Sequence, residues 1–383
     1  MISRADRSGF TAWWWTVDRV ALFAMLALIA IGLMLAFAAS PAATGGPLMP
    51  GDFRYAAKQV AFAAIAAIIL GFSSLLSLRA IKIAAAFVFA LALIGSALVL
   101  FTGSEVLGAK RWIDLGWMTF QPSEFLKPGF AVLAASILAD KAKLVLPKEL
   151  ITFLLIVPAL AVLLLQPDVG QTGLLLALWG ALLFFYGIPL LWIAALAGGS
   201  AALGAVAYFL FPHVHHRVDQ FLGDGAPGYQ TSLALKAFAH GGLLGVGPGA
   251  GTVKYRIPDA HSDFIFAVAG EEFGLVLCGL IALLFCVLSV RLLLRSAKAR
   301  DPFAQLAGAG LAIVIAVQAF INMGVAISLL PAKGMTLPFI SYGGSSLFAV
   351  ALTMGFALAL TRQRSRIGER DHAMFKFLRE ARA

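Results

Sequence analysis

The sequence predicts an all-α, polytopic membrane protein with about ten transmembrane helices. Of its 383 residues, 61% are hydrophobic and 13% are charged, and the mean hydropathy is +0.92. A soluble fold could not bury that much apolar surface. Apolar runs long enough to cross about 30 Å of hydrocarbon as helices recur along the whole chain. The predicted spans are 17–39, 56–76, 80–102, 122–139, 150–166, 169–187, 189–211, 263–290, 304–329 and 345–361.

The distribution of basic residues predicts the orientation of these spans. With the N-terminus in the cytoplasm, 19 of the 29 Lys and Arg residues fall in cytoplasmic segments, as the positive-inside rule requires. We therefore expect one transmembrane domain, 1–383, with a cytoplasmic arm (1–16), a large extracytoplasmic loop between spans seven and eight (212–262) and a basic cytoplasmic tail (362–383). This topology and anionic lipid explain the net charge of +10, so it does not indicate nucleic-acid binding.

The first apolar run has a second interpretation, a cleaved signal peptide. Ala36, Phe37 and Ala38 resemble a signal-peptidase site. The run is longer than the apolar region of a normal signal peptide, and cleavage would give the chain an extracytoplasmic start. We therefore expect a retained anchor.

Asp263 is the residue to which the sequence points first for chemistry. It lies in the segment 257–266 (IPDAHSDFIF), at the entrance of a long apolar run. A carboxylate is costly at membrane depth unless it has a partner or a function, so Asp263 is a candidate catalytic residue. Glu271 and Glu272 would lie about 12 Å deeper on the same helix. At least one of them should face the interior of the bundle.

Basic residues also occur on the side of the membrane where they are disfavoured. One interpretation is scattered solvated charges or head-group anchoring. The other is a binding site for an anion such as a pyrophosphate, which charge-assisted hydrogen bonds would hold. These basic residues are Lys110, Arg111, Lys127, Lys254, Arg256 and Lys333.

Two further acidic residues are embedded in or between apolar runs. Glu124 and Lys127 lie three residues apart, so a helix would bring them together as an ion pair. The pair either neutralises two embedded charges or holds Lys127 toward a polar cavity. Asp168 follows a proline between two runs, where it is either a cap for the next helix or a site residue.

Three other motifs are weaker. The glycine-rich segment 245–251 has no preceding strand and no following Gly-Lys-Ser/Thr, so we expect no nucleotide site there. Ser341 and Ser345 lie in a Gly/Ser segment that suits either close helix packing or ligand binding. We predict no protein metal site, because the one histidine tract lacks other clustered ligands. Its members are His213, His215 and His216.

Taken together, these motifs resemble the SEDS family (shape, elongation, division and sporulation). The similarity covers nearly the whole chain, and residues 331–339 are more similar to the division-type than to the elongation-type members. Ser262 stands where the family usually has Thr, and Gly270 stands where relatives often have Ala or Leu. Both changes are small. The matching segments are 108–113 (GAKRWI), 120–127 (FQPSEFLK), 166–168 (QPD), 258–266 (PDAHSDFIF) and 337–346 (LPFISYGGSS).

The resemblance implies a ten-helix peptidoglycan glycosyltransferase that polymerises lipid II on the outer face of the bacterial cytoplasmic (inner) membrane, at the division septum. The essential acidic residue of the family's His-Thr-Asp-Phe motif falls on Asp263. Joining a sugar hydroxyl to an anomeric carbon requires a base for the hydroxyl proton. Asp263 would activate the GlcNAc 4-hydroxyl, and inversion at MurNAc would give a β-1,4 link. Undecaprenyl diphosphate leaves as a stabilised anion, so no second carboxylic acid is required, unlike in glycoside hydrolysis.

The other candidate residues would bind the substrate. Cations must stabilise the departing phosphates, and a divalent cation, Mg²⁺ or Mn²⁺, would share that work with Asp263. Candidates for the phosphate contacts are Lys110, Arg111, Lys254 and Arg256. Further candidates for substrate binding are Glu124, Lys127, Asp168, His261, Ser341 and Ser345.

Three other functions fit parts of the sequence. An elongation-type polymerase would share all the motifs outside 331–339. A lipid II flippase should have polar residues in both halves of its spans, whereas those here crowd the outer half. A scaffold that only recruits a transpeptidase would not need Asp263. The resemblance also implies a class B penicillin-binding protein, a transpeptidase, and other membrane proteins of the division machinery as partners.

Overall fold

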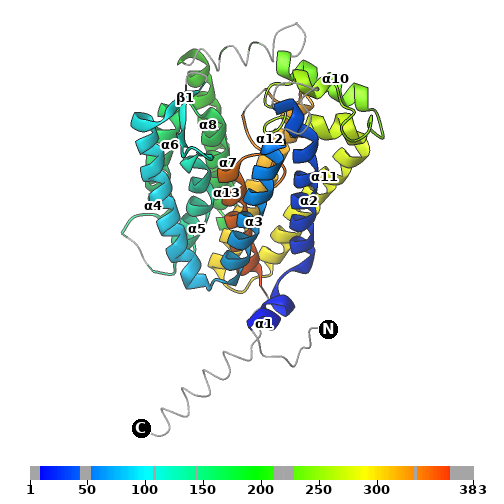
Figure 1. Cartoon of the computed structure of the whole chain (residues 1–383). Helices are drawn as coiled ribbons and strands as arrows, with labels where there is room; N and C mark the ends of the chain where they lie inside the picture. The colour runs from blue at the N-terminus through cyan, green and yellow to red at the C-terminus, as the bar shows by residue number, and fades with distance from the viewer. Residues whose placement is uncertain are drawn as a thin grey trace.

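Long apolar helices form the body of the structure, a computed structural model shown in Figure 1. It describes residues 9–43, 53–106, 109–142, 145–210, 215, 219, 228–331 and 334–362. The α-helices are α1 (Gly9–Thr16), α2 (Arg19–Ala43), α3 (Arg54–Leu75), α4 (Leu78–Thr102), α5 (Leu126–Leu138), α6 (Lys148–Leu165), α7 (Val169–Tyr186), α8 (Leu190–Leu210), α10 (Tyr229–Gly241), α11 (Ile265–Ala297), α12 (Pro302–Ala326) and α13 (Gly344–Thr361). Two 3-10 helices are η1 (Pro122–Phe125) and η2 (Val253–Arg256).

Among the described residues, nine helices are long and apolar enough to cross a membrane. They correspond to nine of the ten predicted spans. The remaining one, 122–139, is divided into η1 and the 13-residue α5. Thirteen residues of α-helix rise about 20 Å, and the four residues of η1 add about 8 Å. The two together therefore approach the thickness of the hydrocarbon core.

The bundle has two different ends (Figure 1). At one end, which we call the terminal end, lie α1 and the last turn of α13. The opposite end, the loop end, carries α10 and the β-strands. Helix α13 is central, because 94% of its most apolar 18-residue stretch is buried inside the protein, whereas the corresponding share for α8 is 0%. Because α8 buries so little against the rest of the chain, nearly its whole surface is available to lipid.

A short antiparallel sheet lies at the loop end, where the sequence analysis expected only a loop. Its strands β1 (Ser104–Val106), β2 (Ala109–Asp114) and β3 (Thr119–Phe120) pair in that order. Gly116 makes the turn from β2 to β3 with φ +81°, a conformation that glycine adopts without steric cost. Its N–H donates to Asp114 Oδ1 at 2.8 Å. The sheet carries Arg111 to the junction of α6 and α7, where its contacts are described below.

A break in α11 receives the segment that follows α10. Gly274 has φ +76°, which interrupts the helix. Backbone groups inside an apolar helix must find partners within the protein, and residues 242–247 supply four of them. A side chain at Gly274 would collide with this segment, because its Cβ would lie 2.2 Å from a backbone carbonyl oxygen. The four bonds run from Val246 N to Glu271 O, Gly247 N to Glu272 O, Leu275 N to Gly242 O and Val276 N to Leu243 O.

Candidate active site

Asp263 lies in a turn directly before α11. The backbone N–H groups of Ser262, Asp263 and Phe264 converge on the carbonyl oxygen of Asp259 at 3.1–3.3 Å. Asp259 itself has φ +53°, which closes the turn. Because α11 begins at Ile265, the positive end of the helix dipole favours the ionised form of the Asp263 carboxylate.

Asn322 of α12 fixes the position of this turn. Its Nδ2 donates to the carbonyl oxygens of Asp263, at 2.9 Å, and of Met335, at 2.6 Å. The asparagine is buried, whereas Asp263 is partly exposed. A Cβ added at Gly334 would lie 3.1 Å from Asp263 Oδ2. The carboxylate is therefore held beside the loop that precedes α13.

Ser341 joins the same loop to the turn. Its hydroxyl donates to the Ser262 carbonyl oxygen at 2.5 Å and accepts the Leu337 N–H at 2.7 Å. The Tyr342 N–H donates to the carbonyl oxygen of His261 at 2.9 Å. The two loop motifs that the sequence analysis singled out separately thus form one structural unit. In it, Ser341 orders the backbone.

His261 belongs to a cluster of aromatic rings. Its ring centroid lies 4.9 Å from that of Tyr55 and 5.4 Å from that of Tyr342. Burial lowers the pKa of His261, and the nearby Asp259 carboxylate opposes this shift in part. The imidazole is therefore neutral at neutral pH and adds no charge beside Asp263.

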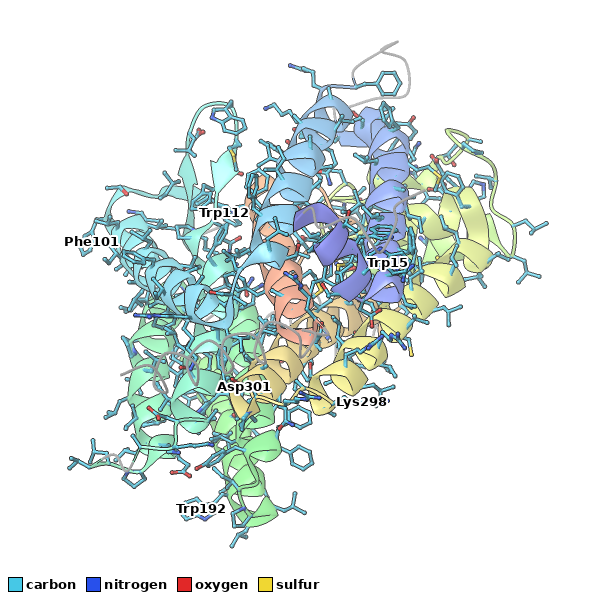
Figure 2. All side chains as sticks on the ribbon, turned by 90° about the horizontal axis from the view of Figure 1, so that it is seen from below. Trp15, Phe101, Trp112, Trp192, Lys298 and Asp301 are labelled. Atoms are coloured by element: carbon cyan, nitrogen blue, oxygen red, sulfur yellow. The ribbon has the colours of Figure 1, made fainter. Side chains whose placement is uncertain are left out.

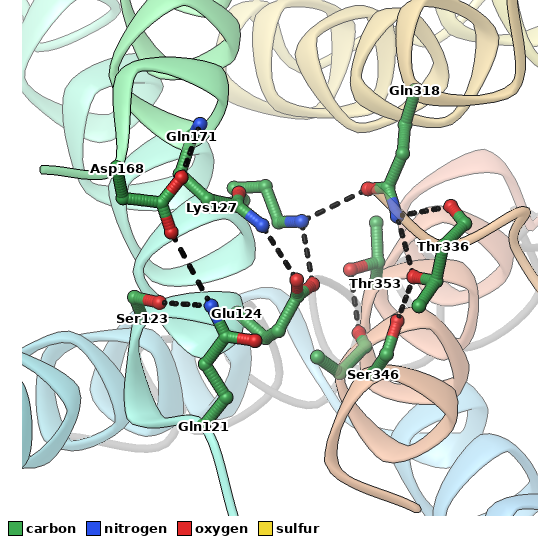
Figure 3. Close-up of polar contacts among 11 residues, drawn as sticks. Gln121, Ser123, Glu124, Lys127, Asp168, Gln171, Gln318, Thr336, Ser346 and Thr353 are labelled. Carbon is green, nitrogen blue, oxygen red and sulfur yellow. Dashed lines mark hydrogen bonds and ion pairs between the residues drawn. The ribbon is translucent and has the colours of Figure 1, made fainter. Parts of the chain in front are cut away.

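A buried ion pair lies next to this unit (Figure 3). Lys127 Nζ is 2.6 Å from Glu124 Oε2, and each side chain is 4% exposed, so the predicted pair is confirmed. Gln171 of α7 donates to Glu124 Oε1 at 2.6 Å, and Lys127 donates to Gln318 Oε1 of α12 at 2.9 Å. Each charge thus has a partner of opposite charge and an amide, which compensates for its removal from water.

Gln318 extends the ion pair toward the loop before α13. Its Nε2 donates to the Thr336 carbonyl oxygen at 3.1 Å. The Thr336 hydroxyl lies 2.5 Å from that of Ser346, at the start of α13 (Figure 3). Since Gln318 and Asn322 are four residues apart, they lie on one face of α12. That face holds the Met335–Thr336 backbone between the ion pair and the Asp263 turn.

Asp168 acts as a helix cap, as one of the two interpretations predicted. Its Oδ1 accepts the Gln171 N–H at 3.2 Å, at the start of α7. The Arg111 guanidinium donates to the carbonyl oxygens of Gln166 and Pro167, at 3.1 and 2.5 Å, and lies 3.9 Å from the Asp168 carboxylate. Burial raises the pKa of Asp168, and the charge of Arg111 opposes this shift. These contacts fix the sheet on the α6–α7 junction.

Glu271 and Glu272 are both at most 1% exposed, which confirms the prediction that at least one of them faces the interior. Glu271 accepts the backbone N–H groups of Thr252, Val253 and Lys254 at 2.7–2.8 Å. The Lys254 ammonium pairs with Glu272 and donates to the Ala38 carbonyl oxygen at 2.7 Å. Lys254 is itself 1% exposed. Its ammonium therefore stabilises η2 against α2 and α11 and does not face solvent.

The remaining candidates lie apart from these networks. Arg256 is exposed and Lys110 partly exposed, and neither has an ion-pair partner among the described residues. Ser345 is buried in the first turn of α13. Lys333, His213 and His216 lie outside the described residues. No group of three or more possible metal ligands occurs in the described part of the chain.

Sequence reasoning missed three site residues: Gln171, Gln318 and Asn322. A signal was present, because polar side chains inside apolar helices are costly and usually have a role. Gln318 and Asn322 are buried in α12, and their spacing of four residues placed them on one helix face. Their partners are far away in sequence, since Lys127 and Gln318 are 191 residues apart.

Comparisons with known proteins agree with this architecture. The family model FTSW_RODA_SPOVE, described as "Cell cycle protein", matches residues 19–366. A protein of Caulobacter vibrioides named "Probable peptidoglycan glycosyltransferase FtsW" is 43% identical over 94% of this chain and 93% of its own.

Two solved structures share the fold. The crystal structure of Thermus thermophilus rod shape determining protein RodA matches with a TM-score of 0.69 and 26% identity, over 92% of this chain and 99% of that one. A chain from a study of polymerisation and crosslinking by a peptidoglycan synthase complex matches with a TM-score of 0.74 and 27% identity, over 90% and 97%. The family match spans the bundle from α2 to beyond α13 and includes every motif described above. The chain therefore belongs to the FtsW, RodA and SpoVE family of cell cycle proteins, the SEDS family that its motifs resembled.

Proposed function

We propose that this protein is an FtsW-type peptidoglycan glycosyltransferase that polymerises lipid II during septal cell-wall synthesis. The observation that carries the proposal is Asp263, a partly exposed acidic residue in a turn before α11 whose backbone carbonyl accepts a hydrogen bond from Asn322 of α12. The name of the Caulobacter relative supports the same activity.

Asp263 is proposed as the general base. It would take the proton from the 4-hydroxyl of the acceptor GlcNAc while that oxygen attacks the anomeric carbon of the donor MurNAc. Inversion at that carbon gives the β-1,4 link, and undecaprenyl diphosphate leaves. The dipole of α11 favours the ionised carboxylate, which is the form that a base requires.

The developing negative charge on the pyrophosphate requires cations. Lys110 and Arg256 are our candidates for this contact, because their charges are not paired within the described residues. Asp263 is the residue that would hold a divalent cation, Mg²⁺ or Mn²⁺, together with substrate phosphates. Mg²⁺ usually binds one or two carboxylates of a protein together with phosphates of the substrate. Such a site requires no cluster of protein ligands. The cation would neutralise phosphate charge.

We place the loop end outside the bacterial inner membrane and both termini in the cytoplasm. The count of basic residues supports this orientation, which gives Asp263 access to exported lipid II. We also propose a class B penicillin-binding protein as partner, since the structural match comes from a complex that couples polymerisation with crosslinking.

Polymerisation of labelled lipid II by the purified protein with its cognate transpeptidase tests the function. Wild type should produce glycan strands and Asp263→Ala should produce none, while it still inserts and binds the partner. Asp114→Asn is the matched control, because Asp114 is an exposed carboxylate at the same end of the bundle. Strand synthesis by Asp263→Ala, or loss of synthesis in the control alone, would refute the assignment.

A further inference from the structure

A cavity of about 720 Å³ opens at the terminal end of the bundle, opposite to Asp263. It lies among the ends of α5, α6, α7, α11 and α12. Its walls are mainly apolar and include Phe185, Leu294, Leu306 and Ala309. No step of the proposed reaction involves this cavity.

The cavity is continuous with the surface that faces lipid. Phe185 and Leu294 both line it, and they are 42% and 56% exposed. In a membrane-spanning bundle such outward apolar side chains contact acyl chains. The apolar part of the cavity therefore suits an acyl chain entering from the surrounding leaflet.

The mouth of the cavity is basic. Lys148 lines it, and Lys141, Lys298 and Arg300 each lie within two residues of a lining residue. Figure 2 looks onto this end of the molecule and shows Lys298 at the turn from α11 to α12. Lys141, Lys298 and Arg300 are exposed, and none has an ion-pair partner among the described residues. Lys148 donates two of its three protons to the carbonyl oxygens of Leu138 and Asp140.

The acidic residues at the same loops do not neutralise these cations through contacts. Asp140 Oδ1 accepts the Ala142 N–H at 3.0 Å, and Asp301 Oδ1 accepts the Phe303 N–H at 2.8 Å as the cap of α12. Both carboxylates thus serve the backbone. The cations remain available for an external anion at the level of the head groups.

We propose that this cavity is a binding site for an anionic phospholipid. One acyl chain occupies the apolar part, and the head-group phosphate binds Lys148 and the exposed cations of the two loops. Basic pockets between transmembrane helices are a known means of recognising anionic head groups. The proposal does not depend on the catalytic function of the loop end.

Native mass spectrometry of the full-length protein tests it, with added phosphatidylglycerol or phosphatidylcholine carrying the same acyl chains. Phosphatidylglycerol should bind more tightly. Lys298→Gln and Arg300→Gln should each weaken the binding of phosphatidylglycerol about fivefold, the effect of one basic residue near a membrane surface. Ala297→Trp should block binding of both lipids, because Ala297, the exposed last residue of α11, lines the cavity.

Arg79→Gln is the matched control, since Arg79 is an exposed cation that does not line the cavity. It should leave the affinity unchanged, and glycerol phosphate without acyl chains should not bind. Equal affinity for the two lipids would overturn the proposal, as would an equal loss in Arg79→Gln. Unchanged binding in Ala297→Trp would place the lipid elsewhere.

Discussion

The buried pair of Glu124 and Lys127 gives the sharpest stability prediction. Replacing Lys127 with Met keeps most of the side-chain volume but leaves the Glu124 carboxylate, 4% exposed, with Gln171 as its remaining partner. Breaking a buried pair from one side costs about 3–5 kcal/mol, because the charge that remains is uncompensated. For a chain of 383 residues, the entropy of unfolding is roughly 0.8 kcal/mol/K, so the apparent melting temperature in detergent should fall by about 4–6 °C.

The double variant Lys127→Met with Glu124→Gln should be more stable than Lys127→Met alone, because no buried charge remains. Gln171 Oε1, which is buried and has no hydrogen-bond partner among the described residues, can then accept a hydrogen bond from the new amide. We expect recovery of at least about 1 kcal/mol, a coupling typical of residues in contact. Lys58→Met is the control for an exposed lysine and should change stability by less than about 0.5 kcal/mol. Additive losses in the double variant would refute the interaction.

Three further predictions concern other parts of the fold. Gly274→Ala should greatly reduce the yield of folded protein, because its Cβ would lie 2.2 Å from a carbonyl oxygen, whereas Gly279→Ala, with open space around it, should not; equal yields would contradict this. The pKa of His261 is lowered in the folded protein, so the neutral ring contributes its full stabilisation above pH 6.5, and this contribution is lost as the pH falls through the lowered value. Melting temperatures measured against pH should therefore decline more steeply in acid for wild type than for His261→Phe. In a background without the two native cysteines, Trp117→Cys should react with impermeant maleimide from the periplasm and Lys298→Cys only after permeabilisation; the opposite sidedness would invert the topology.

The sequence was sufficient for features that depend on local patterns. Hydropathy predicted the spans, and the spacing of Glu124 and Lys127 predicted their ion pair. The cost of embedded carboxylates predicted that at least one of Glu271 and Glu272 faces the interior, and both do, in polar contacts. In each case the physical cause lies within one helix or in the contact between that helix and the membrane.

Features that depend on distant backbone could not be predicted in this way. The break at Gly274 is stabilised by residues 242–247, and glycine in an apolar helix gives no sign of such a partner. Lys254 was expected to bind phosphate because its loop is basic, but it pairs with Glu272 in the interior. Asn322 holds the Asp263 turn across 59 residues of sequence.

The single-turnover rate of lipid II polymerisation by Asp263→Asn tests whether Asp263 removes the proton from the acceptor hydroxyl. The amide keeps the size of the side chain and cannot accept that proton. If Asp263 is the base, the rate should be lower than that of wild type by a factor of about 10²–10⁴, the usual contribution of a general base, and the affinity for lipid II should change little. A rate within about tenfold of wild type, or a loss confined to substrate affinity, would contradict it.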